Sequence, residues 1–363
     1  MTADIVSALA LVARRAAHQS ASPSPSPSAC AACGGDGGDG DDVLAERADG
    51  MVVRHGDAVA KAHAETTDPA DHRARLAVAS HPLLSGILLP PLPTAAGALL
   101  GRPVTSWPYG APVDPADPDA APWEETGTLL ARLHSVPLDA LSRTPLPAMR
   151  GPAKVARALA RLRAVSPPAP GRPTTPTTTV EPAPAPGTGT VKPPISAPAP
   201  GPAPHPIHRA AATLPPWARG EAPPPPSPRA LCHGDLHLGQ LVRYPVSSGA
   251  WVLIDIDDLG AGDPSWDLAR PAAWYAAGLL PPSAWERFLG AYRAAGGPAV
   301  PAGGDPWPQL DVAARALTVQ TAALALVKCA AEHREPDDVE RLMIDACARI
   351  AAIPAELGAG PPS

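Results

Sequence analysis

The apolar residues of the chain fall into two patterns, short runs bounded by turn residues and longer stretches with helical spacing. Short runs rich in Val, Leu and Ile, flanked by Gly, Asp, Pro or Ser, are typical of strands. Strands are therefore predicted at Val43–Glu46, Met51–Arg54, Ala58–His63, Ile87–Leu92, Pro103–Tyr109, Gln240–Tyr244 and Trp251–Ile256. Apolar residues three or four positions apart, between capping and stop residues, indicate helices. Helices are predicted at Asp68–Ser80, Trp123–Val136, Lys154–Val165, Pro271–Gly278, Ser283–Ala295, Leu310–His333 and Val339–Ile353.

Two segments lack this apolar periodicity. Ser20–Asp42 consists of Ser-Pro, Ala and Gly-Asp repeats, and the stretch from Ser166 to about His208 is built from Pro, Thr, Ala and Gly. Neither can bury apolar surface, so both are expected to be disordered, the second as an insertion that the surrounding fold tolerates. A short apolar run, Ile5–Ala13, precedes the first segment. Because an acidic residue comes before it and two arginines follow it, this run predicts an amphipathic helix and not a signal peptide or a membrane span.

Composition narrows the class of partner. A length of 363 residues is enough for two or three domains or lobes, and a net charge of −6 with a pI near 6.0 argues against nucleic acid or an anionic membrane as partner. Five cysteines, an odd number, give no disulfide framework. Cys30 and Cys33 form a lone CxxC without a second ligand pair, so we interpret them as incidental thiols and expect a reducing, cytoplasmic location. The sequence carries no signal for an oligomeric state.

Candidate chemistry is concentrated in one stretch, LCHGDLHLGQLVRYPVSSGAWVLIDIDDLGAGDPSWDLA, from Leu231 to Ala269. A tight His-Gly-Asp turn ending in Asp235 precedes its first predicted strand, and Asp255 lies at the end of the second. Such a hairpin brings Asp235, Gln240 and Asp255 to one end of the unit. A carboxylate that can accept a proton, beside an amide and a second carboxylate that can share a divalent cation, is typical of phosphoryl transfer. A single Asp would more commonly cap a turn, but three linked motifs favour the functional interpretation.

The motifs HGDLHLGQ, IDIDD and GDPSWDLA resemble the catalytic core of the aminoglycoside phosphotransferase family, whose fold is that of the protein kinases. The resemblance implies an α+β, two-lobed fold with a small antiparallel-sheet N-lobe, a mainly helical C-lobe and a nucleotide bound between them. The boundaries predicted on this basis are a mostly disordered extension at 1–42, an N-lobe at 43–106 and a C-lobe at 107–363, with the disordered insertion at about 166–208.

The same resemblance implies residue roles. Asp235 matches the catalytic base that orients and deprotonates the acceptor hydroxyl, and Asp255 matches the aspartate that holds Mg²⁺ on the nucleotide phosphates. Gln240 stands where most family members have an asparagine that binds a second metal ion, and sugar kinases similar to maltokinases also carry glutamine there. A bracing role for the catalytic loop is implied for three further positions, His233, Asp263 and Asp267.

A nucleotide contact is implied in the N-lobe. The third predicted strand begins Ala-Val-Ala-Lys, and it is similar to the kinase strand whose lysine, here Lys61, pairs with the α- and β-phosphates. The kinase lysine is held by a glutamate of the following helix, and the helix predicted here contains no glutamate. Glu65 and Asp71 lie nearest along the chain, and the sequence leaves the acidic partner of Lys61 open.

The predicted function is Mg²⁺-dependent transfer of the γ-phosphoryl group of ATP or GTP to a hydroxyl of a small molecule, of the aminoglycoside, aminosugar or sugar type. Two alternatives stay open: a metabolic sugar kinase of the maltokinase type, and a nucleotide-binding pseudokinase or scaffold that transfers nothing. In the resembling family the C-terminal helices form the acceptor pocket. Their carboxylates would suit the ammonium groups of an aminosugar, although solvated helix ends are their commoner role; they are Asp305, Asp311, Glu332, Glu335, Asp337 and Asp338.

Several aromatic residues of the C-terminal half have two interpretations. Trp266, Trp274 and Tyr275 are predicted to pack in the core, with stacking on a sugar ring as the alternative. His134 is predicted to be a hydrogen-bonded histidine at a helix end and not a ligand.

Overall fold

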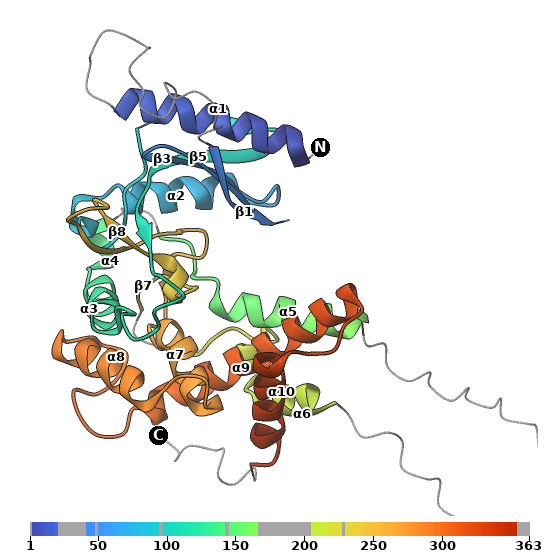
Figure 1. Ribbon diagram of the computed structural model, residues 1–363. Coiled ribbons are helices and arrows are strands. Elements are labelled where there is room, and N and C mark those ends of the chain that lie inside the picture. Colours follow the sequence, from blue (N-terminus) through green and yellow to red (C-terminus); the bar gives the residue numbers. More distant parts are fainter. Residues whose placement is uncertain are drawn as a thin grey trace, which may run out of the picture.

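The computed structural model describes residues 2–20, 41–47, 50–93, 97–141, 145–165, 205–226 and 229–353. Within these ranges a small antiparallel sheet lies at one end of the molecule and a group of helices at the other (Figure 1). The predicted α+β, two-lobed fold is confirmed. The two segments predicted to be disordered lie, apart from their ends, outside the described residues.

Five antiparallel strands form the N-lobe sheet in the order β1-β2-β3-β5-β4. Their bounds are Asp41–Arg47 for β1, Gly50–His55 for β2, Ala58–Ala62 for β3, Gly97–Leu99 for β4 and Arg102–Pro108 for β5. Along β2 and β3, buried residues alternate with half-buried ones, which is the period of a strand with one face on a core. The first three predicted strands and the one predicted at Pro103–Tyr109 are thus confirmed, with small shifts at their ends.

Two helices accompany this sheet, one on either side in Figure 1: α1, Thr2–Ser20, and α2, Pro69–Ala79. Ile5, Leu9 and Ala13 of α1 share a buried cluster with Met51 and Val53 of β2. Burying a large apolar side chain contributes roughly 1.5–3 kcal/mol, which is why the apolar stripe of this segment holds the helix on the sheet. The N-lobe therefore includes α1 in addition to the residues predicted for it.

One predicted strand, Ile87–Leu92, does not form. Instead Leu88 makes a single parallel bridge to Leu253, with hydrogen bonds on either side of it. Two consecutive prolines at positions 90 and 91 follow. Because proline has no N–H to donate, the ladder cannot continue past Leu89, and the apolar run ends as an extended segment.

Helices dominate the C-lobe. Their bounds are Trp123–His134 for α3, Leu138–Leu141 for α4, Gly151–Val165 for α5, Pro206–Thr213 for α6, Ser265–Ala277 for α7, Pro282–Ala294 for α8, Trp307–Glu332 for α9 and Asp338–Ala351 for α10. Helix α9 lies at the centre of this lobe, in contact with α5, α6, α7 and α10. By length and composition α9 is apolar enough to cross a membrane, but its most apolar stretch is 61% buried inside the molecule, as expected of a core helix.

Two small sheets carry the segment in which the candidate chemistry was predicted. Strands β6, β8 and β9 form one sheet in that order, and β7 pairs with β10 in the other. Their bounds are Ala111–Pro112 for β6, Ala230–Cys232 for β7, Leu241–Tyr244 for β8, Ala250–Leu253 for β9 and Gly260–Gly262 for β10. The β8–β9 hairpin is the one predicted. As a result, the β7–β8 loop and the β9–β10 loop lie side by side and hold most of the predicted site residues.

One helix begins well before its predicted start, and another was not predicted. Asp263 accepts a hydrogen bond from the Ser265 backbone N–H at 2.9 Å, so α7 starts at Ser265 and Pro271 lies inside it. Helix α6 starts at Pro206, within the tract predicted to be disordered as far as about His208. Proline suits the first turn of a helix because no N–H is needed there.

Candidate active site

Lys61 at the end of β3 is held by two aspartates of the β9–β10 loop. Its Nζ lies 2.8 Å from Asp255 Oδ1 and 2.9 Å from Asp257 Oδ2. Burial disfavours the charged ammonium, but the two carboxylates outweigh this effect and raise the pKa of Lys61. We call these three residues the Lys61 cluster. The acidic partners of Lys61, which the sequence left open, therefore come from the C-lobe. Asp71 of α2, one of the two candidates, instead has its Oδ2 3.6 Å from Arg75 Nη2.

Two histidines stand behind Asp257. His63 Nδ1 lies 2.7 Å from Asp257 Oδ1, and His63 Nε2 lies 2.8 Å from Thr105 Oγ1. The ring of His72, from α2, contacts the His63 ring edge-on with 4.3 Å between centroids. Burial, with a smaller effect of the neighbouring His63, lowers the pKa of His72 to about 4, so its imidazole is neutral at pH 7. Its Nε2 is buried without a hydrogen-bond partner among the described residues.

The backbone at Asp255 adopts the left-handed conformation, with φ +65°. Asp tolerates this conformation better than most residues, yet it still costs about 1 kcal/mol or more, a cost often found at functional sites. Asp255 Oδ1 accepts a hydrogen bond from the Asp257 backbone N–H at 3.2 Å as well as from Lys61. The other oxygen, Oδ2, has no partner among the residues that the structure describes.

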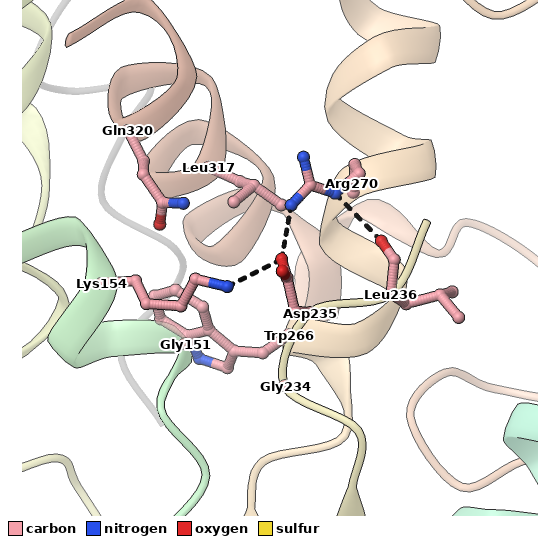
Figure 2. Close-up of a pocket in the computed structure, with 9 residues that line it drawn as sticks. All are labelled: Gly151, Lys154, Gly234, Asp235, Leu236, Trp266, Arg270, Leu317 and Gln320. Atoms are coloured by element: carbon pink, nitrogen blue, oxygen red, sulfur yellow. Dashed lines mark hydrogen bonds and ion pairs between the residues drawn. The ribbon is translucent and has the colours of Figure 1, made fainter. Parts of the chain in front are cut away.

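Asp235 in the β7–β8 loop lies between two cations, Lys154 of α5 and Arg270 of α7 (Figure 2). Lys154 Nζ lies 2.8 Å and Arg270 Nη2 2.7 Å from the same carboxylate oxygen, Oδ1. Burial would raise the pKa of Asp235, but the two cations outweigh it and hold this pKa well below its usual range. Lys154 Nζ also lies 2.8 Å from Asp258 Oδ2. We call Lys154, Asp235 and Asp258 the Lys154 cluster.

The β7–β8 loop is fixed by Asp267, a buried carboxylate on α7. Asp267 accepts hydrogen bonds from the backbone N–H groups of His233, at 2.6 Å, and Gly234, at 2.7 Å. His134 Nε2 lies 3.0 Å from the same carboxylate, and His134 Nδ1 lies 2.8 Å from the Tyr292 hydroxyl. Burial opposes ionisation of Asp267, but these hydrogen bonds lower its pKa. His134 is thus a hydrogen-bonded helix-end residue, as predicted, and it positions Asp267.

Two contacts tie the β7–β8 loop to the β9–β10 loop. His233 Nε2 lies 2.8 Å from the carbonyl oxygen of Ile254, the residue before Asp255. Gly234, with φ +84°, approaches Asp258 so closely that an added Cβ would lie 2.3 Å from the Asp258 carbonyl oxygen. Only glycine fits this position, and the close approach sets Asp235 beside Asp258. Of the three predicted bracing residues, His233 and Asp267 contact the loops directly, whereas Asp263 starts the helix that carries Asp267.

Gln240 ends the β7–β8 loop and is buried. Its backbone carbonyl oxygen accepts a hydrogen bond from the Ile254 N–H at 2.9 Å. Its side-chain amide nitrogen lies 3.3 Å from His237 Nε2. Its amide oxygen, like Asp255 Oδ2, has no partner within the described part of the chain. Oxygen donors of this kind suit Mg²⁺. The residues present therefore fit a divalent cation held by Asp255 and Gln240.

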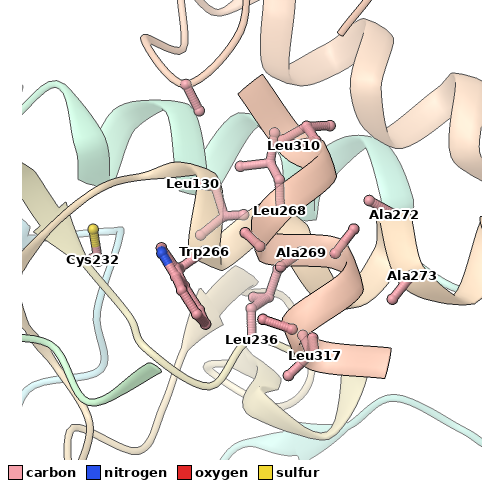
Figure 3. Close-up of a cluster of buried hydrophobic side chains, with 14 of the residues drawn as sticks. Leu130, Cys232, Leu236, Trp266, Leu268, Ala269, Ala272, Ala273, Leu310 and Leu317 are labelled. Atoms are coloured by element: carbon pink, nitrogen blue, oxygen red, sulfur yellow. The ribbon is translucent and has the colours of Figure 1, made fainter. Parts of the chain in front are cut away.

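Two pockets lie on either side of Arg270. The first, beside Asp235, is lined by nine residues from α5, the β7–β8 loop, α7 and α9 (Figure 2). The second has a volume of about 320 Å³ and lies between α3, the same loop and α7. Trp266 lines the first and Trp274 the second, and a buried apolar cluster that includes Trp266 supports the loop (Figure 3). Tyr275 stacks on Trp285 in the core, with 5.4 Å between ring centroids.

Five of the six carboxylates considered for an aminosugar have other partners in the structure. Three form ion pairs with an arginine a few residues away, namely Asp311, Glu332 and Asp338. Two accept hydrogen bonds from backbone N–H groups at helix starts, namely Asp305 and Asp337. None of the six lines either pocket beside Arg270.

Sequence reasoning identified Lys61 but missed the cations beside Asp235. Lys154 and Arg270 lie on helices whose patterns predicted only packing, and Asp257 and Asp258 are part of the IDIDD motif but received no role. One signal was available for Lys154: the chain contains four lysines, and two of them contact the predicted aspartates.

Fold and site together define the class of this protein as a small-molecule phosphotransferase with a protein-kinase-like fold. The model of the phosphotransferase enzyme family, APH, matches residues 37–310, well over half of the chain. The chain belongs to this family. No curated protein matches its sequence.

Solved structures of similar fold include three kinases and phosphotransferases. Choline kinase LicA from Streptococcus pneumoniae is 12% identical, with 86% of this chain and 92% of that chain covered and a TM-score of 0.50. A choline/ethanolamine kinase family protein from Mesorhizobium loti is 14% identical, with 86% of each chain covered and a TM-score of 0.49. Macrolide 2'-phosphotransferase MphH from Brachybacterium faecium is 18% identical, with 88% and 94% covered and a TM-score of 0.42. At these identities the likeness concerns the fold alone.

Proposed function

We propose that this phosphotransferase moves the γ-phosphoryl group of ATP or GTP to a hydroxyl of a small polyhydroxylated molecule, of the aminoglycoside, aminosugar or sugar type. The observation that carries the proposal is the joined pair of loops. The hydrogen bond between His233 and Ile254, at 2.8 Å, sets Asp235 and Asp255 on neighbouring loops, with Lys61 paired to Asp255. A phosphoryl donor and a hydroxyl acceptor need such groups on opposite sides of the transferred phosphorus.

Asp235 positions the acceptor. Its Oδ1 is occupied by Lys154 and Arg270, and its Oδ2 is left to accept the hydrogen bond of the acceptor hydroxyl. Because its pKa is held low, Asp235 stays ionised and is a weak base. A weak base suits a transition state with little bond formation to the nucleophile, in which the proton leaves late. Its main contribution is therefore orientation, and it takes the proton as the new bond to phosphorus forms.

The Lys61 cluster prepares the nucleotide side. Asp255 and Asp257 keep Lys61 charged and in place, so that its Nζ can pair with phosphate oxygens. When bound, Mg²⁺ neutralises developing charge on the phosphates, and the free oxygens of Asp255 and Gln240 would hold it. The left-handed backbone at Asp255 turns this carboxylate to a fixed direction next to Lys61.

Asp235→Asn tests the proposal. Transfer of labelled phosphate from ATP and from GTP would be measured with Mg²⁺ over a panel of aminoglycosides, aminosugars and sugars including maltose. The variant is expected to lose about 10²–10⁴-fold in kcat, the usual contribution of such a group. Asp345→Asn, on the exposed face of α10, is the matched control and should retain activity. Tight nucleotide binding without transfer to any acceptor would overturn the proposal and support a nucleotide-binding scaffold.

A further inference from the structure

The pocket beside Asp235 holds more positive than negative charge. Of the nine residues that line it, Asp235 is the only carboxylate, while Lys154 and Arg270 contribute two cations. Both cations contact Asp235 Oδ1, at 2.8 and 2.7 Å, from two different helices (Figure 2). On the proposed function, the acceptor hydroxyl binds to Asp235. Any group next to that hydroxyl therefore meets an ammonium and a guanidinium.

The space between these side chains is small. It amounts to about 10 Å³, room for roughly one water molecule. An acceptor therefore enters only when one of the cations moves. Both cations have a second partner, since Arg270 Nε lies 3.0 Å from the Leu236 carbonyl oxygen and Lys154 Nζ lies 2.8 Å from Asp258 Oδ2, but Lys154 has the more flexible, aliphatic stem. Lys154 is thus the side chain expected to turn from Asp235 toward the acceptor, where its N–H donors meet oxygen atoms.

Gln320 adds a neutral hydrogen-bonding group on the opposite wall, on α9. Its side chain is only 4% exposed, and its amide oxygen is buried without a partner among the described residues. The amide lies at the pocket, facing the side on which Lys154 and Asp235 meet (Figure 2). A buried amide left unpaired is costly, so a ligand that supplies a hydroxyl here gains a hydrogen bond that the protein alone does not make.

An ammonium group on the acceptor finds no counter-charge in this pocket. The single carboxylate already has two cationic partners, and no carboxylate of α9 or α10 is among the residues that line the pocket: Asp311, Glu332, Asp338 and Glu340 pair with arginines elsewhere. A cation beside Lys154 would instead be repelled at short range in a partly buried site. Like-charge contact of this kind is how a site rejects a competitor.

We propose that the acceptor is a polyhydroxyl compound of the sugar class that carries no positive charge next to its reacting hydroxyl. Lys154 and Arg270 donate hydrogen bonds to its oxygens, and Gln320 pairs with one of its hydroxyls. This narrows the proposed function, on which it rests, away from aminoglycosides and aminosugars. The residues that decide it lie on α5, α7 and α9, outside the HGDLHLGQ, IDIDD and GDPSWDLA motifs.

Matched sugars that differ only in charge test this inference. Glucose and glucosamine, galactose and galactosamine, and glucuronate as the anionic member would be compared with the full chain. Both kcat/KM and the equilibrium Kd in the presence of a non-hydrolysable ATP analogue would be measured. The amino sugars are expected to be at least about tenfold weaker than their neutral partners in either quantity. The glucuronate arm distinguishes a neutral from an anionic acceptor.

Two variants locate the discrimination. Lys154→Met should reduce the preference against amino sugars to about threefold or less, while the exposed Lys328→Met leaves it unchanged. Gln320→Leu should raise KM and Kd about tenfold for every sugar, while Gln309→Leu on the exposed part of α9 should have no effect. A structural role for Gln320 would instead change unfolding without changing the Kd of folded protein.

The outcomes separate this inference from the proposed function. Discrimination in Kd without any transfer would overturn the phosphotransfer and leave the acceptor class standing. Equal or tighter binding of the amino sugars, with transfer to them, would overturn the acceptor class and leave the phosphotransfer. Neither binding nor transfer for any member would overturn the assignment of a sugar.

Discussion

The molecule contains the same arrangement twice, a lysine held between two aspartates. In the Lys61 cluster and in the Lys154 cluster every lysine–aspartate distance is 2.8 or 2.9 Å. Both lysine side chains are largely buried. The aspartates of both clusters lie on loops that follow a short strand. On geometry alone the two clusters would be assigned the same role.

Their surroundings differ in charge. One lysine against two aspartates leaves the Lys61 cluster with one surplus negative charge, backed by His63 and His72. In the Lys154 cluster Arg270 contacts Asp235, and Arg150 lies 4.0 Å from Asp258, so three cations face two aspartates. The first cluster is thus suited to receive a divalent cation with its phosphates, and the second to receive neutral or anionic oxygen atoms. Identical lysine–aspartate contacts acquire different functions from the next layer of residues.

The largest expected effect comes from removing the negative surplus. Asp255→Asn should lower kcat/KM by about 10³-fold, because it removes both a cation ligand and the charge that holds Lys61. Asp258→Asn, the matching change in the Lys154 cluster, should cost only about tenfold, since Arg270 still positions Asp235. Phosphate transfer as a function of Mg²⁺ concentration measures both. If the Asp258 variant lost as much as the Asp255 variant, the two clusters would not differ in function.

The second largest expected effect comes from disturbing the contact between the β7–β8 loop and Asp258. Gly234→Ala should destabilise the protein by about 3 kcal/mol, because the added Cβ meets the Asp258 carbonyl oxygen and the residue has positive φ. Urea unfolding measures the change. Gly290→Ala is the control: it lies on α8 with no atom within 4 Å of the added Cβ, and should gain about 0.5–1 kcal/mol. An Asp235 loop that tolerates alanine at 234 would mean that its contact with Asp258 does not hold the Lys154 cluster together.

A smaller effect distinguishes Lys61 from Lys154 by the substrate whose KM each of them changes. Lys61→Met should raise the KM for the nucleotide about 10–100-fold, the contribution of one or two charge-assisted hydrogen bonds, with the acceptor KM unchanged. Lys154→Met should do the reverse. Steady-state kinetics with each substrate varied in turn gives the comparison. If both variants raised the same KM, the assignment of one cluster to each substrate would be wrong.

Asp235, Asp255 and Lys61 were predictable from sequence, whereas the two cations beside Asp235 were not. Asp235 and Asp255 lie in motifs whose order and spacing indicate their chemistry within a single stretch of chain. Lys154 and Arg270 reach Asp235 from helices with ordinary amphipathic patterns, and nothing local marks them. The pair of Lys61 and Asp255 spans 194 positions, so no local pattern could show that these carboxylates replace the glutamate missing from α2.

The fold was predictable where periodicity and turn residues agree. The hairpin of β2 and β3 and the capped start of α2 are examples, and both follow from local chemistry. Prediction failed at prolines, which can either end an element or be tolerated within it. The prolines after Leu89 end the strand that the apolar run predicted, whereas Pro271, predicted to begin a helix, lies inside α7. The packing of α1 on the sheet depends on a surface that is distant in sequence. The amphipathic stripe of α1 shows that the helix needs a partner surface, but it does not show which one.

The smallest expected effect concerns how the stability of the folded protein behind the Lys61 cluster depends on pH. His72, behind the Lys61 cluster, has a pKa of about 4 in the folded protein against an ordinary value of 6.5. The unfolded chain therefore takes up the proton first as pH falls, and the free energy of unfolding decreases between pH 6.5 and 4. Removing this group with His72→Phe should reduce the stability lost between pH 7 and pH 4.5 by about 1–2 kcal/mol.

Urea unfolding of both proteins at the two pH values measures the difference, and His208→Phe, at a half-buried position on α6, should follow the wild type. Burial also lowers the pKa of His237, near the Lys154 cluster, to about 4, so acid destabilises both clusters and His72→Phe removes only the part of the loss that arises behind the Lys61 cluster. If His72→Phe lost as much stability as the wild type, the imidazole would not be held neutral in the folded protein. Its buried Nε2 would then need a partner, and the negative surplus of the Lys61 cluster would be partly neutralised before any nucleotide binds.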